Sequence, residues 1–182
     1  MKRLSLPLAI VASLSLALMA GAAANNGTGK LKVESPGVGL ELKVAGRPAP
    51  VPNGKEVPMP PGTYPTSSIT YGAQGKAANG KAEVWTIKST GPFGTLKDIN
   101  VTAGQTTTVE AGGPLAVKAN VFPVKGKDGA ISVSVSLRVT GKAGEVYNTG
   151  SIMKGLIKAP APQIQILSED GKTLAQGNFE YG

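Results

Sequence analysis

The stretch Ile131-Ser132-Val133-Ser134-Val135-Ser136-Leu137-Arg138-Val139-Thr140 decides the fold class of this chain. Apolar and polar residues alternate through all ten positions without a slip. Because successive side chains of a β-strand point to opposite faces, this pattern predicts a strand with one buried face and one face in water. After residue 24 no stretch shows a convincing helical apolar period, so we expect an all-β protein.

Further segments on the N-terminal side show the same alternation. Val38–Val44 repeats it, and Leu115, Val117, Ala119 and Val121 share one face of another predicted strand. Weaker strands are expected at 69–71, 81–88, 99–101, 106–111, 163–167 and 173–181.

Turn residues separate these predicted strands. Four dipeptides tolerate the positive φ of tight turns: Asn53-Gly54, Asn79-Gly80, Asp128-Gly129 and Asp170-Gly171. Asn79-Gly80 and Asp170-Gly171 each lie between two strand-forming runs, so both predict β-hairpins. The 25 Gly and 14 Pro residues also favour short strands joined by turns.

The N-terminus has the three parts of a secretory signal. Lys2-Arg3 is positively charged, residues 4–19 are largely apolar, and residues 20–24 are Ala and Gly. Ala22 and Ala24 occupy the −3 and −1 positions if cleavage precedes Asn25. We therefore expect a signal peptide at 1–24 and a secreted or periplasmic protein. No later apolar run is long enough to span a membrane, so we expect no span after cleavage.

Composition and charge narrow the function classes. The chain has no Cys and no His, which excludes disulfides and removes the commonest general base and metal ligand. Without the two basic residues of the leader, the net charge is 19 − 2 − 11 = +6. The lysines are spread singly with no basic run among aromatics, so we expect no nucleic-acid partner. Such a surface either keeps the protein soluble or attracts anionic envelope polymers.

A domain boundary is predicted at Gly112-Gly113-Pro114, because paired glycines loosen the backbone and proline cannot donate to a sheet ladder. It divides the mature chain into domains at 25–112 and 113–182. The second is expected to be a small immunoglobulin-like β domain that packs against the first. One continuous sandwich across the boundary is the alternative.

Two motifs in the first domain resemble a known family. Met59-Pro60-Pro61-Gly62-Thr63-Tyr64 is similar to the "L-P-P-G-x-Y" turn of transthyretin-like, carboxypeptidase regulatory-like domains, which leads into a strand. Residues 99–109, INVTAGQTTTV, resemble the "V-x-x-G-x-T-x-x-V" pattern that closes those domains. The chain departs from the family in its long 71–82 segment and in a partial entry motif at 46–51. The resemblance implies a Greek-key β-sandwich over about 30–112, in a family that is mostly accessory and not catalytic.

Three aromatic residues are the candidate ligand or partner contacts: Tyr64, Tyr71 and Trp85. A planar ring on a sheet face can stack on a sugar or anchor a partner protein. Trp85 alternates with Ile87, and Tyr71 with Ile69, so both rings are also candidates for core packing. Core packing and an exposed binding platform both fit the pattern.

The short motifs that could carry catalysis lack their companions. Ser151 and Lys154 have the S-x-x-K spacing of penicillin-recognising enzymes, but flanking glycines argue against the helix that this motif needs. The segment 75–82 has Ala82 where a phosphate-binding loop needs Ser or Thr. Glu169-Asp170 lies in a predicted turn that points both carboxylates into solvent. We therefore expect no enzyme, no catalytic residue, no cofactor and no bound metal.

The expected fold is thus one or two small Greek-key β-sandwiches, immunoglobulin-like or transthyretin-like, after the signal peptide. The expected function is a non-enzymatic module with a structural or protein-interaction role in the cell envelope. That role predicts an exposed apolar strand edge or patch. A polysaccharide-binding module that uses Trp85 and Tyr71 is the alternative, and an unrecognised hydrolase would need Ser151 and Lys154 together in a pocket.

Overall fold

The computed structural model describes residues 27–77 and 79–179, and the predicted signal peptide lies outside this part. The described residues form an all-β protein with several sheets, as expected. Their only helical element is the single 3₁₀ turn η1 (Gly94–Leu96). The strands are β1 (Gly29–Val33), β2 (Val38–Val44), β3 (Arg47–Val51), β4 (Glu56–Met59), β5 (Gly62–Lys76), β6 (Ala82–Ser89), β7 (Asp98–Val101), β8 (Thr106–Val109), β9 (Ala116–Lys125), β10 (Ile131–Thr140), β11 (Val146–Lys154), β12 (Ile157–Lys158), β13 (Gln163–Leu167) and β14 (Thr173–Asn178).

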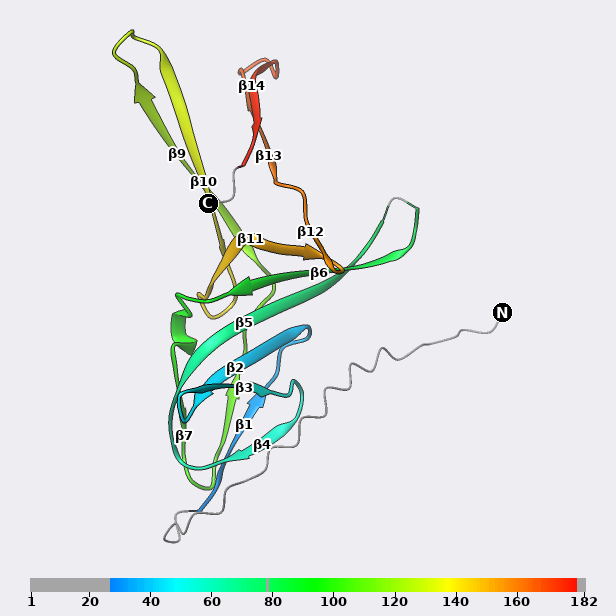
Figure 1. The fold of residues 1–182 in the computed structure, drawn as a ribbon, viewed down its shortest axis with the longest axis vertical. Coiled ribbons are helices and arrows are strands. Elements are labelled where there is room, and N and C mark those ends of the chain that lie inside the picture. The colour runs from blue at the N-terminus through cyan, green and yellow to red at the C-terminus, as the bar shows by residue number, and fades with distance from the viewer. Residues whose placement is uncertain (1–26, 78, 180–182) are drawn as a thin grey trace.

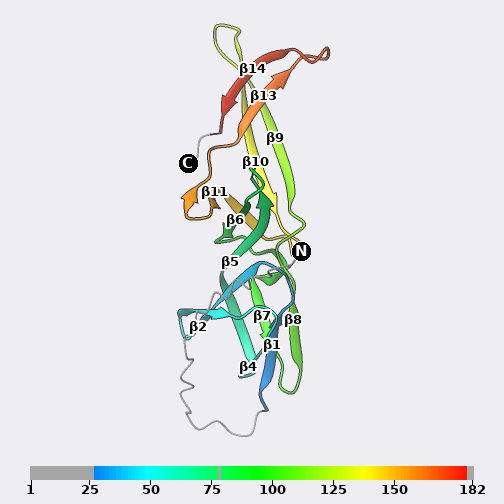
Figure 2. The same ribbon diagram turned by 90° about the vertical axis from the view of Figure 1, so that its right-hand side faces the viewer.

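The described residues form three sheets (Figure 1). The largest has nine strands in the order β3-β2-β5-β6-β11-β10-β9, with β7 beside β5 and β12 beside β11. A three-stranded sheet has the order β4-β1-β8, in which β1 and β8 run parallel. Strands β13 and β14 form a separate antiparallel hairpin. Figure 2 shows that the molecule is elongated, with β1, β4 and β8 near one end and β13–β14 near the other.

The hydrophobic core joins the three-stranded sheet to the N-terminal strands of the large sheet, an arrangement consistent with a β-sandwich. Alternate residues of β1 and β2 point into it, which is why both strands show alternating burial. Its least exposed apolar side chains are Leu31, Val33, Leu40, Leu42 and Ile69.

The turn predictions are confirmed. Asn79-Gly80 lies in the β5–β6 hairpin turn and Asp170-Gly171 in the β13–β14 turn, and the two glycines have φ of 76° and 81°. Asp128-Gly129 lies in the turn that joins β9 to β10. Strands β2 and β10 have the bounds that alternation predicted.

The large sheet continues across Gly112-Gly113-Pro114, because β6 from the first half pairs with β11 from the second. The linker itself packs closely on Tyr71. A Cβ atom on Gly112, whose φ is 77°, would lie 2.6 Å from Cδ2 of Tyr71. The linker is therefore held against β5 in a backbone conformation that glycine adopts without strain.

Glu145 also holds the linker in place, through a hydrogen bond to Gly112. Its side chain is fully buried, and its carboxyl oxygens accept hydrogen bonds from the backbone N–H of Gly112 (2.6 Å), the backbone N–H of Ala143 (2.9 Å) and the hydroxyl of Tyr147 (2.9 Å). Burial, together with the hydrogen bond to Glu145, raises the pKa of Tyr147 well above its usual range. The neutral phenol is the donor, so this contribution to stability is present below the ordinary tyrosine pKa of about 10 and is lost as the pH rises above it.

Candidate interaction surface

Two of the three candidate aromatic residues contact the core. Tyr64 and Tyr71 both lie on β5, are partly buried and pack against the core cluster. The Tyr64 hydroxyl donates to the carbonyl of Pro60 at 2.7 Å, and burial raises the pKa of Tyr64 above its ordinary value. Because the two tyrosines are seven residues apart, they lie about 20 Å from each other along the strand. They do not form one site.

Trp85 is half-buried on β6 and does not belong to the core cluster. It lies opposite Ala73, and Tyr71 lies opposite Ile87, so Trp85 and Tyr71 share one face of the sheet. The ammonium nitrogen of Lys154 lies 5.5 Å from the centre of the indole ring and also pairs with Glu83 at 2.7 Å. The cation thus covers part of the indole ring that a sugar ring would use for stacking.

The serine and lysine of the S-x-x-K motif have separate partners. The Ser151 hydroxyl donates to the Asn148 carbonyl at 2.6 Å and accepts from the backbone N–H of Lys88 at 2.8 Å. Lys154 pairs with Glu83. The motif lies on strand β11, whose pairing with β6 is irregular between Asn148 and Met153, and Ser151 and Lys154 bond to different partners there.

The most extensive exposed apolar surface of the described residues lies on the β9–β10 hairpin. Strands β9 and β10 pair over their whole length, from Ala116 opposite Thr140 to Lys125 opposite Ile131. Directly opposed residues share a face, so one side of the hairpin is apolar except for Lys125 at its tip. We call this side the apolar face; its residues are Val117, Ala119, Val121, Pro123, Ile131, Val133, Val135, Leu137 and Val139.

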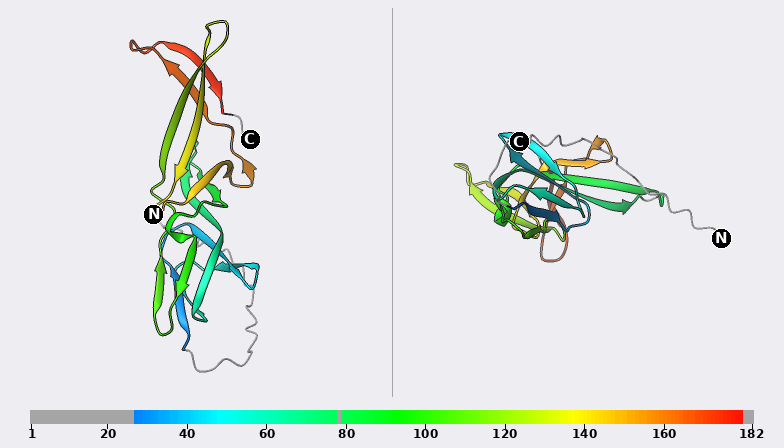
Figure 3. Two further views of the ribbon diagram at one scale, coloured as in Figure 1. Left: turned by 90° about the vertical axis from the view of Figure 1, so that its left-hand side faces the viewer. Right: turned by 90° about the horizontal axis from the view of Figure 1, so that it is seen from below.

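The apolar face is largely exposed, which corrects the expectation that the face of Ile131–Thr140 would be buried. Only Val139, at the base of β10, is buried, whereas Ile131 is 71% exposed and Val121 59%. The reason is visible in Figure 3, where the hairpin extends beyond the core sheets. The opposite side is mostly polar but carries two large exposed apolar residues, Phe122 and Val124.

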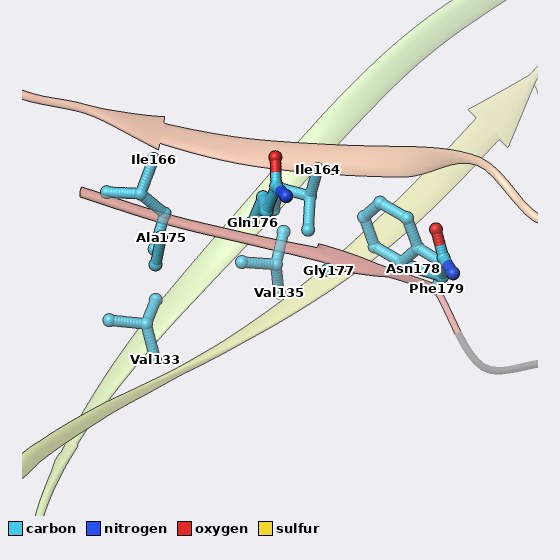
Figure 4. A pocket seen from close by; sticks show the side chains of 9 residues that line it. All are labelled: Val133, Val135, Ile164, Ile166, Ala175, Gln176, Gly177, Asn178 and Phe179. Atoms are coloured by element: carbon cyan, nitrogen blue, oxygen red, sulfur yellow. The ribbon is translucent and has the colours of Figure 1, made fainter. Parts of the chain in front are cut away.

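The C-terminal hairpin β13–β14 faces the β10 side of the apolar face across a groove. Figure 4 shows Ile164 and Ile166 of β13 above Val133 and Val135 of β10. The groove has a volume of about 410 Å³, is open to solvent and has no charged residue in its lining. Gln176 and Asn178 supply its polar side chains, and Phe179 and Ala175 complete the apolar wall.

No protein-family model matches the sequence, and neither a curated protein nor a solved structure is detectably similar to it. Within residues 27–77 and 79–179, no three His, Cys, Asp or Glu side chains cluster as metal ligands would. The same residues contain no helix of the length and apolarity needed to cross a bilayer.

The candidate surface therefore differs from the one the sequence suggested. An open, uncharged groove with few polar side chains suits burial of apolar groups better than proton transfer or anion binding. The alternating pattern of the apolar face predicts a buried face, but the structure leaves most of this face exposed. The sequence predicts a strand at 163–167, but it does not show that Ile164, Ile166 and Phe179 line a groove with β10, because this depends on the position of the C-terminal hairpin.

Proposed function

We propose that this protein is an exported, non-enzymatic β-sandwich module that has a structural or protein-interaction role in the cell envelope. The observation that supports this function is the apolar face of the β9–β10 hairpin, which is exposed along most of its length. Contiguous apolar surface of this kind marks interaction sites on soluble proteins. The transthyretin-like assignment of residues 30–112 belongs to the same proposal and rests on the two motifs at 59–64 and 99–109.

Export is tested on the N-terminus of the purified protein. The leader predicts cleavage after Ala24, so the exported form begins at Asn25. N-terminal sequencing or intact-mass measurement of the periplasmic or medium fraction checks this. Recovery of the whole population in the cytoplasm with Met1 in place would contradict the exported location.

Interaction is tested by capture of envelope components on the immobilised protein. Replacing Val121 and Val133 together by serine removes apolar groups from the face, and each fully buried valine contributes about 1.5–3 kcal/mol. We expect the double variant to capture at least about tenfold less envelope protein than the wild type does. The matched control replaces Ser132 and Ser134, on the opposite side of β10, by alanine and keeps wild-type capture.

The same capture assay tests the alternative function, polysaccharide binding. The position of Trp85 and Tyr71 on one face of the sheet favours this alternative. That function predicts retention on insoluble envelope glycan and its loss in a Trp85→Ala variant, with no effect of the valine substitutions. Capture that is insensitive to the apolar face but sensitive to Trp85 would replace the first function with the second.

A further inference from the structure

We propose that a row of cations on the open side of the large sheet binds a linear anionic polysaccharide. The row, which we call the cationic row, consists of Lys118, Arg138 and Lys88, with Asn148 between the last two. It lies on the side of the sheet opposite the apolar face. The site therefore goes beyond the proposed function and does not depend on what the apolar face binds.

Strand pairing builds the row. Lys118 on β9 lies directly opposite Arg138 on β10, and Asn148 on β11 lies directly opposite Lys88 on β6. Arg138 and Asn148 each adjoin one residue of the buried pair Val139–Tyr147, so both side chains point away from the core. The four side chains thus follow one another on successive strands, and about 14 Å separates Lys118 from Lys88.

The positive charge of the row is not neutralised within the chain. Like charges directly opposite each other destabilise a strand pair, and Lys118 and Arg138 are such a pair. Among the described residues, no ion pair includes Lys118, Arg138 or Lys88. Glu83 is the one acid in strands β6, β9, β10 and β11; it lies on the other side of the sheet and pairs with Lys154. A bound anion would therefore relieve repulsion that the fold leaves in place.

The row is accessible along its whole length. All four of its residues are exposed. The three-stranded sheet packs against the core side of the large sheet, and the C-terminal hairpin faces the apolar face, so neither covers the row. A chain-like ligand that lies across the strands can contact all three cations at once.

The polar side chains around the row suit a ligand that is rich in hydroxyl groups. Asn120 and Ser136 form the next pair on the same side toward the hairpin tip, and Thr70 lies opposite Lys88 at the other end. The Oδ1 atom of Asn148 accepts the backbone N–H of Gly150 at 2.8 Å, so its NH₂ group is the part that can donate to a ligand. Amide and hydroxyl groups both donate to and accept from sugar hydroxyls.

The same surroundings argue against two other polyanionic partners. Phe122 is an exposed aromatic residue on this side, but it is four residues from Lys118, about 13 Å along the strand. A lipid surface is bound by apolar side chains that lie beside cations, and a single-stranded nucleic acid by aromatic rings beside cations. The neighbours of the row are hydroxyls and amides, which favours a polysaccharide.

Isothermal titration calorimetry with polygalacturonate, a linear polysaccharide with a carboxylate on each sugar, tests the site at pH 7. We expect the wild type to bind it and not to bind dextran, which is neutral. Replacing Lys118 and Arg138 together by glutamine is expected to raise the dissociation constant at least about tenfold, because two charge-assisted contacts are lost.

The matched control replaces Lys125 and Lys127 together by glutamine, which removes the same charge from the hairpin tip. Lys125 is seven residues from Lys118, about 23 Å along the strand. At an ionic strength of about 0.1 M, screening acts over about 10 Å, so we expect the dissociation constant to change less than about twofold. An equal loss of binding in both double variants would assign binding to net charge and overturn the site.

A charge reversal separates loss of binding from loss of folding. Lys118→Glu is expected to abolish binding of polygalacturonate. The free energy of unfolding in urea is expected to stay the same or rise, because opposite charges then face each other across the strand pair. Binding that persists in Lys118→Glu would overturn the proposal.

Two other outcomes would also overturn it. Binding that is lost in Trp85→Ala but kept in the Lys118–Arg138 double variant would place the site on the other side of the sheet. Binding of phosphatidylglycerol vesicles through the row, without binding of polygalacturonate, would replace the polysaccharide with a lipid surface. The row variants leave the apolar face intact, so capture of an envelope protein tests the proposed function independently.

Discussion

Replacing Glu145 by alanine is expected to lower the free energy of unfolding by about 4 kcal/mol. The side chain is completely buried and accepts three hydrogen bonds, from Gly112, Ala143 and Tyr147. Alanine leaves these three donors without an acceptor in a region closed to water, and it also creates a cavity beside Gly141. Urea unfolding at pH 7, followed by circular dichroism, measures the change.

Two further substitutions test whether the lost hydrogen bonds of Glu145 cause the loss of stability. Glu145→Gln keeps the shape and one acceptor oxygen but turns an amide N–H toward a donor, so a loss of about 2 kcal/mol is expected. Glu110→Ala is the control, because Glu110 is paired with Lys142 at a half-exposed site and such ion pairs contribute at most about 1 kcal/mol. Equal losses for Glu110→Ala and Glu145→Ala would refute the role of Glu145 as the anchor of the linker.

Replacing Ile69 by alanine is expected to cost about 2–5 kcal/mol, whereas the same substitution at Ile131 costs less than about 0.5 kcal/mol. Both isoleucines lie on strands with alternating patterns, but Ile69 is 0% exposed and Ile131 71%. Only the first leaves a cavity in packed surroundings. Urea unfolding of both variants, followed by circular dichroism, measures the contrast. A loss for Ile131→Ala as large as that for Ile69→Ala would contradict the exposed position of Ile131.

Sequence analysis predicted the secondary structure well because it depends on local pattern. Alternation defined the bounds of β2 and β10, and Asp-Gly and Asn-Gly dipeptides located the hairpin turns. The burial of Glu145 was not predicted from the sequence. An acidic residue beside a turn is normally expected in solvent. Two of the donors to Glu145, Ala143 and Tyr147, are local, but the third comes from Gly112, which only the tertiary structure brings to this turn.

At the candidate site, too, the sequence shows which residue types are present, whereas the structure shows which of them lie together. Tyr64, Tyr71 and Trp85 were selected because of their ring chemistry, yet the first two contact the core and the third lies under Lys154. In the S-x-x-K spacing at 151–154, the Ser151 hydroxyl bonds to the backbone of Asn148, whereas Lys154 pairs with Glu83. The apolar groove joins β10 to a hairpin nearly thirty residues later, a contact that no local pattern encodes.

Read without a structure, the chain determines which side chains share a strand face and where the backbone turns, because both follow from the pleat and from residues within a few positions. It does not determine what covers each face. Ile131 and Val38 begin equally regular alternating runs, but the first is exposed and the second is buried. Burial depends on which distant strand folds over a face, and tertiary structure alone places the three-stranded sheet against β2 while leaving the apolar face of β9–β10 open.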